Sequence, residues 1–292
     1  MGVPDDRARA AVSPSSSGLR LDAAAKLNLG LRVTGRREDG WHELEGIFVL
    51  LDLADRLLLM PGCSGLRVEG EGMRDLPLDE RNLAWRGLVA GLDGPPDLAC
   101  LTLEKRIPAA AGLGGGSSDA AAAWRLGRAW RGRPDAADVD ELVALSTIGA
   151  DVPFFASGVA AAEVTGIGER VRPIRLGSWH AVLARPAFGL STAAVFHELR
   201  RDEWGTADND LLAPALRLRP ELGNVLAAVR RAGGEPRLTG SGSTVFTLTD
   251  DSERAGSVAD RLRDAGLSVI LTRTRTEPPR IEAIHPEEED EA

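Results

Sequence analysis

Apolar and polar residues alternate along residues 25–33, which read AKLNLGLRV. Every second residue from Leu27 to Val33 is apolar, and this is the period of a half-buried β-strand. The apolar positions share one face, while Lys26 and Asn28 lie two residues apart on the other. The pattern therefore predicts a strand that presents an amine and an amide side by side.

The rest of the chain mixes strand-like and helix-like patterns. Residues 46–60, GIFVLLDLADRLLLM, indicate two strands separated by a turn near residues 52–55. Further strands are predicted at 98–108, in a hairpin at 159–174, at 179–184, around a glycine turn at 236–249 and at 267–272. Helices are predicted at 82–92, 117–130, 139–148, 192–199, 210–216, 220–232 and 252–265. A loop is predicted at 149–158. Because strands and helices do not alternate regularly, the fold class is predicted to be α+β with two lobes.

Length and charge narrow the classes of function. The chain has 292 residues, which suits about two domains, and a formal net charge of −9. Its last six residues, EEEDEA, carry five negative charges, so the remainder is only mildly acidic. This balance argues against nucleic acid as a partner. No apolar run approaches the roughly 20 residues that span a bilayer, so no membrane association is expected.

Two features of the chain bear on its location. The first 18 residues are rich in Pro, Ser and Gly and lack the apolar stretch of a secretory signal, so they are predicted to be a disordered leader. Cys63 and Cys100 are the only cysteines, and they match neither a disulfide framework nor metal-site spacing. A reducing cytoplasm is therefore the expected location.

Residues 112–119, GLGGGSSD, lie between a predicted strand and a predicted helix. The first N–H groups of a helix have no partners within it, and the helix dipole places partial positive charge there. Glycines let the backbone approach an anion closely, and the hydroxyls of Ser117 and Ser118 can bind phosphate or a metal. We therefore favour a phosphate site over a simple glycine turn. The stretch matches neither the Walker A nor the G-x-G-x-x-G pattern.

The pattern P-x-x-x-G-L-G-G-G-S-S-D-A-A, which starts at Pro108, resembles the second motif of the GHMP kinases. This family includes galactokinase, homoserine kinase and mevalonate kinase. Three further segments match in the family's order: residues 25–44, the GADVPFF stretch at 149–155 and the LTGSGSTVF stretch at 238–246. The triple glycine and the first segment resemble the members that phosphorylate a diphosphocytidyl sugar alcohol. The resemblance covers roughly residues 19–275.

The resemblance implies a fold and a division of the chain. The expected fold is the two-lobed GHMP kinase fold, with an N-terminal lobe like domain 2 of ribosomal protein S5 and a ferredoxin-like C-terminal lobe. Residues 19–176 would bind ATP and carry the catalytic groups, and residues 177–276 would bind the second substrate. Residues 1–18 and the acidic tail at 277–292 lie outside these lobes. A monomer or weak homodimer is expected.

The implied reaction moves the γ-phosphoryl group of ATP to the 2-hydroxyl of a diphosphocytidyl methylerythritol, a step in non-mevalonate isoprenoid synthesis. Asp151 would accept the hydroxyl proton, and Lys26 would stabilise charge during transfer. Mg²⁺ is the expected metal, with Ser118 as a candidate ligand and Asp119 as a helix cap. The implied ATP-binding residues are Pro108, Ala109, Ala110, Ala111, Gly112, Leu113, Gly114, Gly115, Gly116, Ser117 and Ser118.

The second substrate is implied to bind between the lobes. Trp41 stands where the family usually has tyrosine, and it still offers a stacking face for cytosine. His42 can hydrogen-bond the edge of that base. The implied substrate-binding residues are Asn28, Trp41, His42, Phe196, Gly240, Ser241 and Gly242.

Three alternatives remain. Another GHMP kinase, acting on homoserine, mevalonate or a sugar, is disfavoured by the GWH loop and the triple glycine. A non-catalytic nucleotide- or RNA-binding module would use residues 124–134, WRLGRAWRGRP, where arginine alternates with tryptophan. However, Trp124 and Trp130 fall on the predicted buried stripe, with Arg125 and Arg128 on its solvated face. A nicotinamide dehydrogenase lacks its glycine fingerprint.

Overall fold

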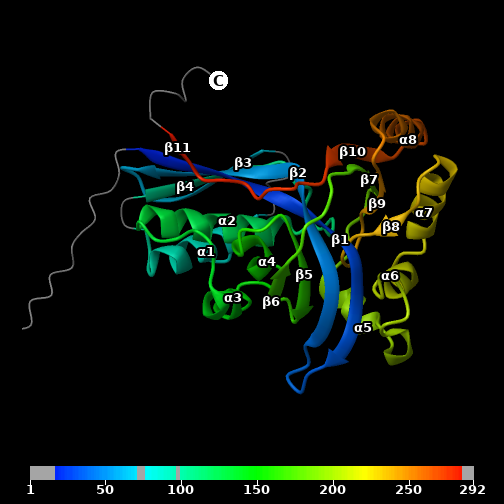
Figure 1. The fold of residues 1–292 in the computed structure, drawn as a ribbon, viewed down its shortest axis with the longest axis horizontal. Helices are drawn as coiled ribbons and strands as arrows, with labels where there is room; N and C mark the ends of the chain where they lie inside the picture. The colour runs from blue at the N-terminus through cyan, green and yellow to red at the C-terminus, as the bar shows by residue number, and fades with distance from the viewer. Residues whose placement is uncertain (1–16, 71–75, 97–98, 285–292) are drawn as a thin grey trace, which may run out of the picture.

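A computed structural model describes residues 17–70, 76–96 and 99–284 and forms two lobes, each built on a β-sheet (Figure 1). The larger sheet has strand order β11-β1-β2-β4-β3, and β5 and β6 extend it from β2. The smaller sheet has order β10-β7-β9-β8, with every pair antiparallel. The predicted two-lobed α+β organisation is confirmed.

Most predicted elements are present within a few residues of their expected bounds. The strands are β1 (Gly18–Arg36), β2 (His42–Pro61), β3 (Gly65–Gly70), β4 (Ala99–Lys105), β5 (Ala161–Gly166), β6 (Arg170–Pro173), β7 (His180–Arg185), β8 (Arg237–Leu238), β9 (Val245–Thr249), β10 (Ser268–Arg273) and β11 (Glu282–Ile284). The helices are α1 (Leu83–Leu92), α2 (Gly115–Trp130), α3 (Val139–Leu145), α4 (Val152–Ala156), α5 (Thr192–Glu198), α6 (Leu212–Leu218), α7 (Leu222–Arg231) and α8 (Ser252–Asp264), with the 3-10 turn η2 (Arg201–Glu203).

The turn predicted near residues 52–55 is wrong, because β2 runs through it as one strand of 20 residues. Its first half pairs with β5, its second half with β4, and β1 pairs along nearly all of it. The two aspartates that suggested a turn are accommodated differently. Asp52 is exposed, whereas Asp55 is buried and accepts hydrogen bonds from the backbone N–H groups of Arg106 and Ile107.

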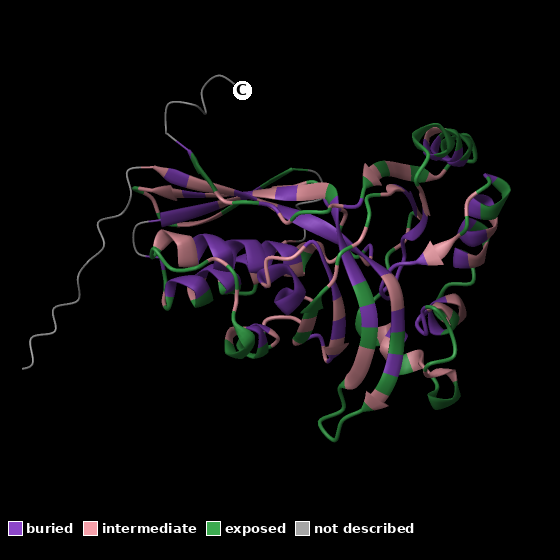
Figure 2. Cartoon of the chain, in the orientation of Figure 1, coloured by how far each residue is buried: buried purple, intermediate pink, exposed green. Residues whose placement is uncertain are grey.

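Helices α1 and α2 lie side by side against one face of the larger sheet, and their facing sides are buried (Figure 2). They approach closely because Gly127 of α2 lies against Gly91 of α1. A Cβ on Gly127 would lie 3.0 Å from the backbone carbonyl carbon of Gly91. Trp124 is buried as predicted. Arg125 was expected in solvent, but it is buried and donates to the Asp135 side chain and the Pro279 carbonyl.

Two segments differ from their predicted form. The predicted loop at 149–158 contains the short helix α4, all of whose side chains are buried, because its apolar residues fill the core beside β2. The predicted acidic tail at 277–292 includes β11, which pairs with the first three residues of β1. The remaining parts of the predicted leader and tail, residues 1–16 and 285–292, lie outside the described residues.

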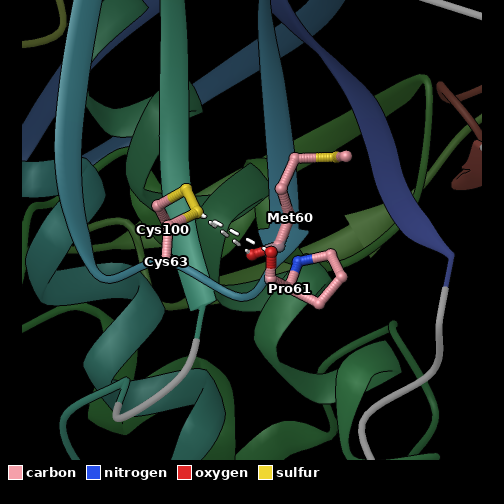
Figure 3. The surroundings of a disulfide bond; sticks show 4 residues. All are labelled: Met60, Pro61, Cys63 and Cys100. Atoms are coloured by element: carbon pink, nitrogen blue, oxygen red, sulfur yellow. Dashed lines mark hydrogen bonds between the residues drawn. A yellow bond between two sulfur atoms is a disulfide. The ribbon is translucent and has the colours of Figure 1, made fainter. Parts of the chain in front are cut away.

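Cys63 and Cys100 form a disulfide bond, so the expectation that they do not pair is corrected (Figure 3). The fold brings them together because β4 pairs with β2 at Met60 and with β3 at Gly65, which places Cys100 beside the β2–β3 turn. The Cys63 sulfur also lies 3.9 Å from the Met60 carbonyl, a contact rather than a hydrogen bond because a disulfide sulfur carries no proton. Among the described residues, no helix is both long and apolar enough to cross a membrane.

Candidate active site

The glycine stretch opens helix α2 as predicted and lines a cavity of about 550 Å³. Gly114 is the N-cap, with a φ of 74°, and no side chain caps the helix there. The N–H groups of the first turn are thus left for a ligand, at the positive end of a 16-residue helix. All ten residues from Pro108 to Ser117 line this cavity, which has the size and shape of a small-molecule site.

The structure corrects two expectations at the start of α2. The Ser118 hydroxyl donates to the Ala24 carbonyl at 2.7 Å, inside the sheet–helix interface, so Ser117 is the hydroxyl residue that lines the cavity. Asp119 does not cap the helix. Its carboxylate instead accepts a hydrogen bond of 2.7 Å from Lys105, and its other oxygen, Oδ1, is buried without a partner among the described residues.

Lys26 and Asp151 meet on the wall of the same cavity. The Lys26 ammonium lies 3.4 Å from the Asp151 carboxylate and donates to Asn28 Oδ1 at 2.5 Å and to the Gly112 carbonyl at 3.1 Å. Register shifts in the β1–β2 pairing flank both Lys26 and Asn28, and such bulges redirect side chains near functional sites. The two residues were predicted on the polar face of a strand, and they are buried under the glycine stretch.

Asp151 precedes helix α4, but its side chain makes no capping hydrogen bond. The side chain is 32% exposed, whereas that of Lys26 is 4% exposed. The carboxylate therefore has one oxygen held near a buried cation and remains open to a ligand in the cavity. This geometry suits a group that receives a proton from a bound alcohol.

A second cavity adjoins the first and contains the predicted aromatic residues. Trp41 and His42 line it, and Phe196 lines both cavities. The His42 ring stacks on Phe196 with centroids 5.2 Å apart, and Trp41 is 53% exposed. Burial and the charge of Arg36 lower the pKa of His42, so this ring is neutral at neutral pH.

Sequence reasoning missed Trp204, which completes this group of rings. It contacts His42 edge-on at 5.7 Å and lines the second cavity. Its buried Nε1–H group has no hydrogen-bond partner among the described residues. Trp204 follows η2, in a stretch without periodic signal, so only the fold places it beside His42.

The loop between β8 and β9 closes the first cavity from the second lobe. Gly240 and Ser241, which were predicted to bind the second substrate, line it. Gly242 is not among the lining residues and packs instead on the glycine stretch, where a Cβ on Gly112 would come within 2.8 Å of the Gly242 carbonyl. Loop and glycine stretch are therefore in direct backbone contact.

Sequence reasoning also missed Lys105, whose ammonium bridges Asp55 and Asp119 beneath the glycine stretch. Burial opposes the charged form, but the two carboxylates outweigh it and raise the pKa of Lys105. Burial also raises the pKa of Asp119 well above its usual range.

The composition of the chain could have pointed to Lys105. Of the 35 Lys and Arg residues, only Lys26 and Lys105 are lysines, and both line this cavity.

Part of the first cavity is lined by the apolar residues Leu76, Pro77, Leu83 and Leu103, together with Arg81 and Asn82. Gly116 lies next to Leu83 and Gly114 lies next to Lys26, so the glycine stretch connects this apolar part with Lys26. A ligand with a flat apolar part and a chain of phosphates could therefore lie along the cavity with its last phosphate near Asp151.

Two family models match the chain. The N-terminal domain of the GHMP kinases matches residues 82–159, and the C-terminal domain of the GHMP kinases matches residues 193–267. The first match contains the glycine stretch and Asp151, and the second contains Phe196 and the β8–β9 loop.

Relatives are similar over most of the chain. A 4-diphosphocytidyl-2-C-methyl-D-erythritol kinase of Thermus thermophilus is 39% identical over 265 residues, which cover 84% of this chain and 92% of the relative. That of Deinococcus radiodurans is 40% identical and covers 82% and 87%. A crystal structure of 4-(cytidine 5'-diphospho)-2C-methyl-D-erythritol kinase matches with a TM-score of 0.70 and 36% identity, over 87% of this chain and 98% of the other. A homoserine kinase from Cytophaga hutchinsonii shares the fold, with a TM-score of 0.66 at 15% identity.

Proposed function

Because the chain belongs to the GHMP kinase family, and within it to the 4-diphosphocytidyl-2-C-methyl-D-erythritol kinases, we propose that it transfers the γ-phosphoryl group of ATP to the 2-hydroxyl of 4-diphosphocytidyl-2-C-methyl-D-erythritol. One observation carries this proposal. A cavity along the glycine stretch and a cavity lined by aromatic rings adjoin, and they share Phe196, Thr192, Ala150 and Leu44. Asp151 lies next to this shared wall.

The two substrates would enter from opposite ends. The triphosphate of ATP lies along the free amides of α2, with adenine at the apolar part near Leu83. Cytosine stacks between Trp41 and Phe196, and its edge forms hydrogen bonds with neutral His42 and with the Trp204 N–H, which has no partner in the described part of the chain. The sugar alcohol then reaches Asp151, and the loop of Gly240 and Ser241 faces the substrate phosphates. Residues 19–176 thus serve ATP and catalysis and also contact cytosine through Trp41 and His42. Residues 177–276 contribute Phe196, Trp204 and the loop of Gly240 and Ser241 to the site of the second substrate.

The transfer itself needs positioning and charge stabilisation more than covalent chemistry. The 2-oxygen of the substrate forms a bond to the γ-phosphorus as the bond from that phosphorus to the bridging oxygen breaks, and the bonding electrons leave with ADP. Asp151 receives the hydroxyl proton. The Lys26 ammonium and the amides of α2 face the charge that develops on the transferred group.

Mg²⁺ would accompany ATP, as is usual in phosphoryl transfer, and would neutralise part of the phosphate charge. The described residues hold no group of three carboxylate, His or Cys ligands. This suits an ion held mainly by phosphates and waters. The residues that would hold such an ion are Ser117 and Asp119, which line the cavity. Asp119 Oδ1 is buried and has no partner among the described residues.

We also propose that the enzyme works on this small molecule in isoprenoid precursor synthesis in the cytoplasm. The Cys63–Cys100 bond removes the argument from unpaired cysteines, so this location follows only from the proposed ATP-dependent reaction. We propose that the enzyme works as a monomer or a weak homodimer.

The most direct test is a panel of alcohols in a coupled assay for ADP release. Turnover is expected with 4-diphosphocytidyl-2-C-methyl-D-erythritol, and rates near background are expected with mevalonate and homoserine, because neither has a base to fill the aromatic cavity. The control is methylerythritol phosphate without the cytidine, which should also fail. Equal turnover of mevalonate or homoserine would refute the assigned substrate.

The state of His42 predicts how substrate binding depends on pH. Its pKa is lowered from the usual value of about 6.5, so the ring is neutral at pH 7 and gains a proton only at a pH below that usual value. Protonation removes its acceptor and adds charge beside Arg36. We therefore expect the KM for the diphosphocytidyl substrate to rise on acidification, while the KM for ATP changes little.

The control is the His42→Gln variant, whose side chain stays neutral across the range. The KM of this variant for the diphosphocytidyl substrate should be higher than that of wild type at every pH. It should not increase further as the pH is lowered. A wild-type KM that is flat between about pH 7.5 and pH 5 would show that the neutral ring is not used.

A further inference from the structure

We propose that Thr239 is a positioning residue for Lys26, so that the position of the β8–β9 loop governs the orientation of the catalytic amine. This inference rests on the function proposed above. Thr239 belongs to the second lobe, lies at the end of β8 and is fully buried. Its hydroxyl does not line either cavity, so it acts through other residues rather than on a substrate.

The Thr239 hydroxyl contacts the strand that carries Lys26. It accepts a hydrogen bond from the Asn28 backbone N–H at 3.2 Å, and it lies 3.3 Å from Asn28 Oδ1. It also lies 3.2 Å from the Gly112 carbonyl. Its single proton can be donated to either oxygen.

These two oxygens are also partners of Lys26. A lysine ammonium has three donor positions, and Lys26 directs them at Asn28 Oδ1, the Gly112 carbonyl and the Asp151 carboxylate, while the ammonium also lies 5.4 Å from the centroid of the Phe48 ring. One hydroxyl thus touches both uncharged acceptors that aim the ammonium toward Asp151. If that hydroxyl is lost, both acceptors can turn, and Lys26 loses its fixed direction.

The β8–β9 loop is also bound to the glycine stretch. The Thr244 N–H donates to the Ala111 carbonyl at 3.3 Å, and the Gly242 N–H donates to the Thr239 carbonyl at 2.9 Å. A Cβ on Gly112 would come within 2.5 Å of the Thr239 carbonyl. The loop that bears Gly240 and Ser241 is therefore held against both the phosphate site and the catalytic strand, and a substrate that presses on this loop acts on Lys26 through Thr239.

The test compares Thr239→Val with Thr239→Ser in the full-length enzyme. Valine keeps the shape of threonine but removes the hydroxyl, and serine keeps the hydroxyl. We expect Thr239→Val to lower kcat by roughly 10- to 100-fold while the KM values for ATP and for the diphosphocytidyl substrate stay within about threefold. Thr239→Ser should retain kcat within about threefold of wild type.

A merely structural role predicts a different outcome. It would lower the unfolding temperature of Thr239→Val without this split between kcat and KM, or it would lower kcat equally in both variants. Either result overturns the proposal, as does an unchanged kcat. If the valine variant does not fold, Thr239→Ala replaces it in the comparison with serine.

A double-mutant cycle with Asn28→Ala tests the route through Asn28. If Thr239 acts on Lys26 through Asn28, the double variant should have a kcat within about threefold of that of Asn28→Ala alone. Full additivity overturns this route. If the wild-type protein shows no turnover, the proposed function is refuted but the role of Thr239 is not. Crystal structures then test that role: the Thr239→Val variant should lose the contact between Lys26 Nζ and Asn28 Oδ1. Retention of this contact would overturn the role proposed for Thr239.

Discussion

Replacing Asp151 with asparagine is expected to lower kcat by about 10³-fold while leaving the KM for ATP within about threefold of wild type. An amide cannot receive the proton of the substrate hydroxyl, and Asp151 is the cavity carboxylate that lies beside Lys26. The phosphate site proposed above consists of backbone amides of α2, which this change does not touch. Loss of chemistry with retention of ATP binding is therefore the signature of a base at this position.

The measurement is steady-state ADP release over a range of both substrates, together with calorimetric binding of an ATP analogue. Asp140→Asn is a matched control, because Asp140 is an exposed carboxylate in the first turn of α3. It should behave as wild type. Turnover by Asp151→Asn within about tenfold of wild type would remove Asp151 from the role of base.

Replacing Lys26 with methionine is expected to lower kcat by about 10²- to 10³-fold, because it removes a positive charge next to the position proposed for the transferred group. Methionine keeps most of the buried volume, so the fold should survive. The expected effect on the KM for ATP is small. Lys26→Arg should also be slow, since a planar guanidinium cannot reproduce the three compact contacts of the ammonium with Asn28, Gly112 and Asp151.

The two residues should act as one unit. The double variant Lys26→Met with Asp151→Asn is expected to be about as slow as Asp151→Asn alone, because each change disables the same step. The unfolding temperatures of all variants serve as the control for folding. Effects that multiply in the double variant would mean that lysine and aspartate contribute independently, contrary to their contact of 3.4 Å.

Much of the candidate site could be predicted from the sequence because its parts are short and contiguous. The glycine stretch, the strand with Lys26 and Asn28, and the GADVPFF segment each contain several functional positions within ten residues. In such segments local spacing fixes which side chains share a face. The resemblance to a family then linked segments that the chain keeps far apart in sequence.

What could not be predicted depends on contacts between distant parts of the chain. Trp204 reaches His42 only because the second lobe turns back on the first, and no local period marks it. The continuous strand β2 required knowledge that Asp55 would be satisfied by the backbone of residues 106 and 107. The Cys63–Cys100 bond follows from the β4 register, which spacing along the sequence does not contain. Ser117 and Ser118 differ in role because a helix turns adjacent residues to different sides.

The scarcity of lysine has a practical consequence for covalent chemistry. The only ε-amino groups in the sequence belong to Lys26 and Lys105, and both side chains are under 10% exposed on the wall of a single cavity. A bulky acylating reagent finds no side-chain amine on the surface of the folded protein. A reactive carbonyl or acyl group carried on a nucleotide would meet only these two side-chain amines, so its attachment to either lysine would report occupancy of this pocket.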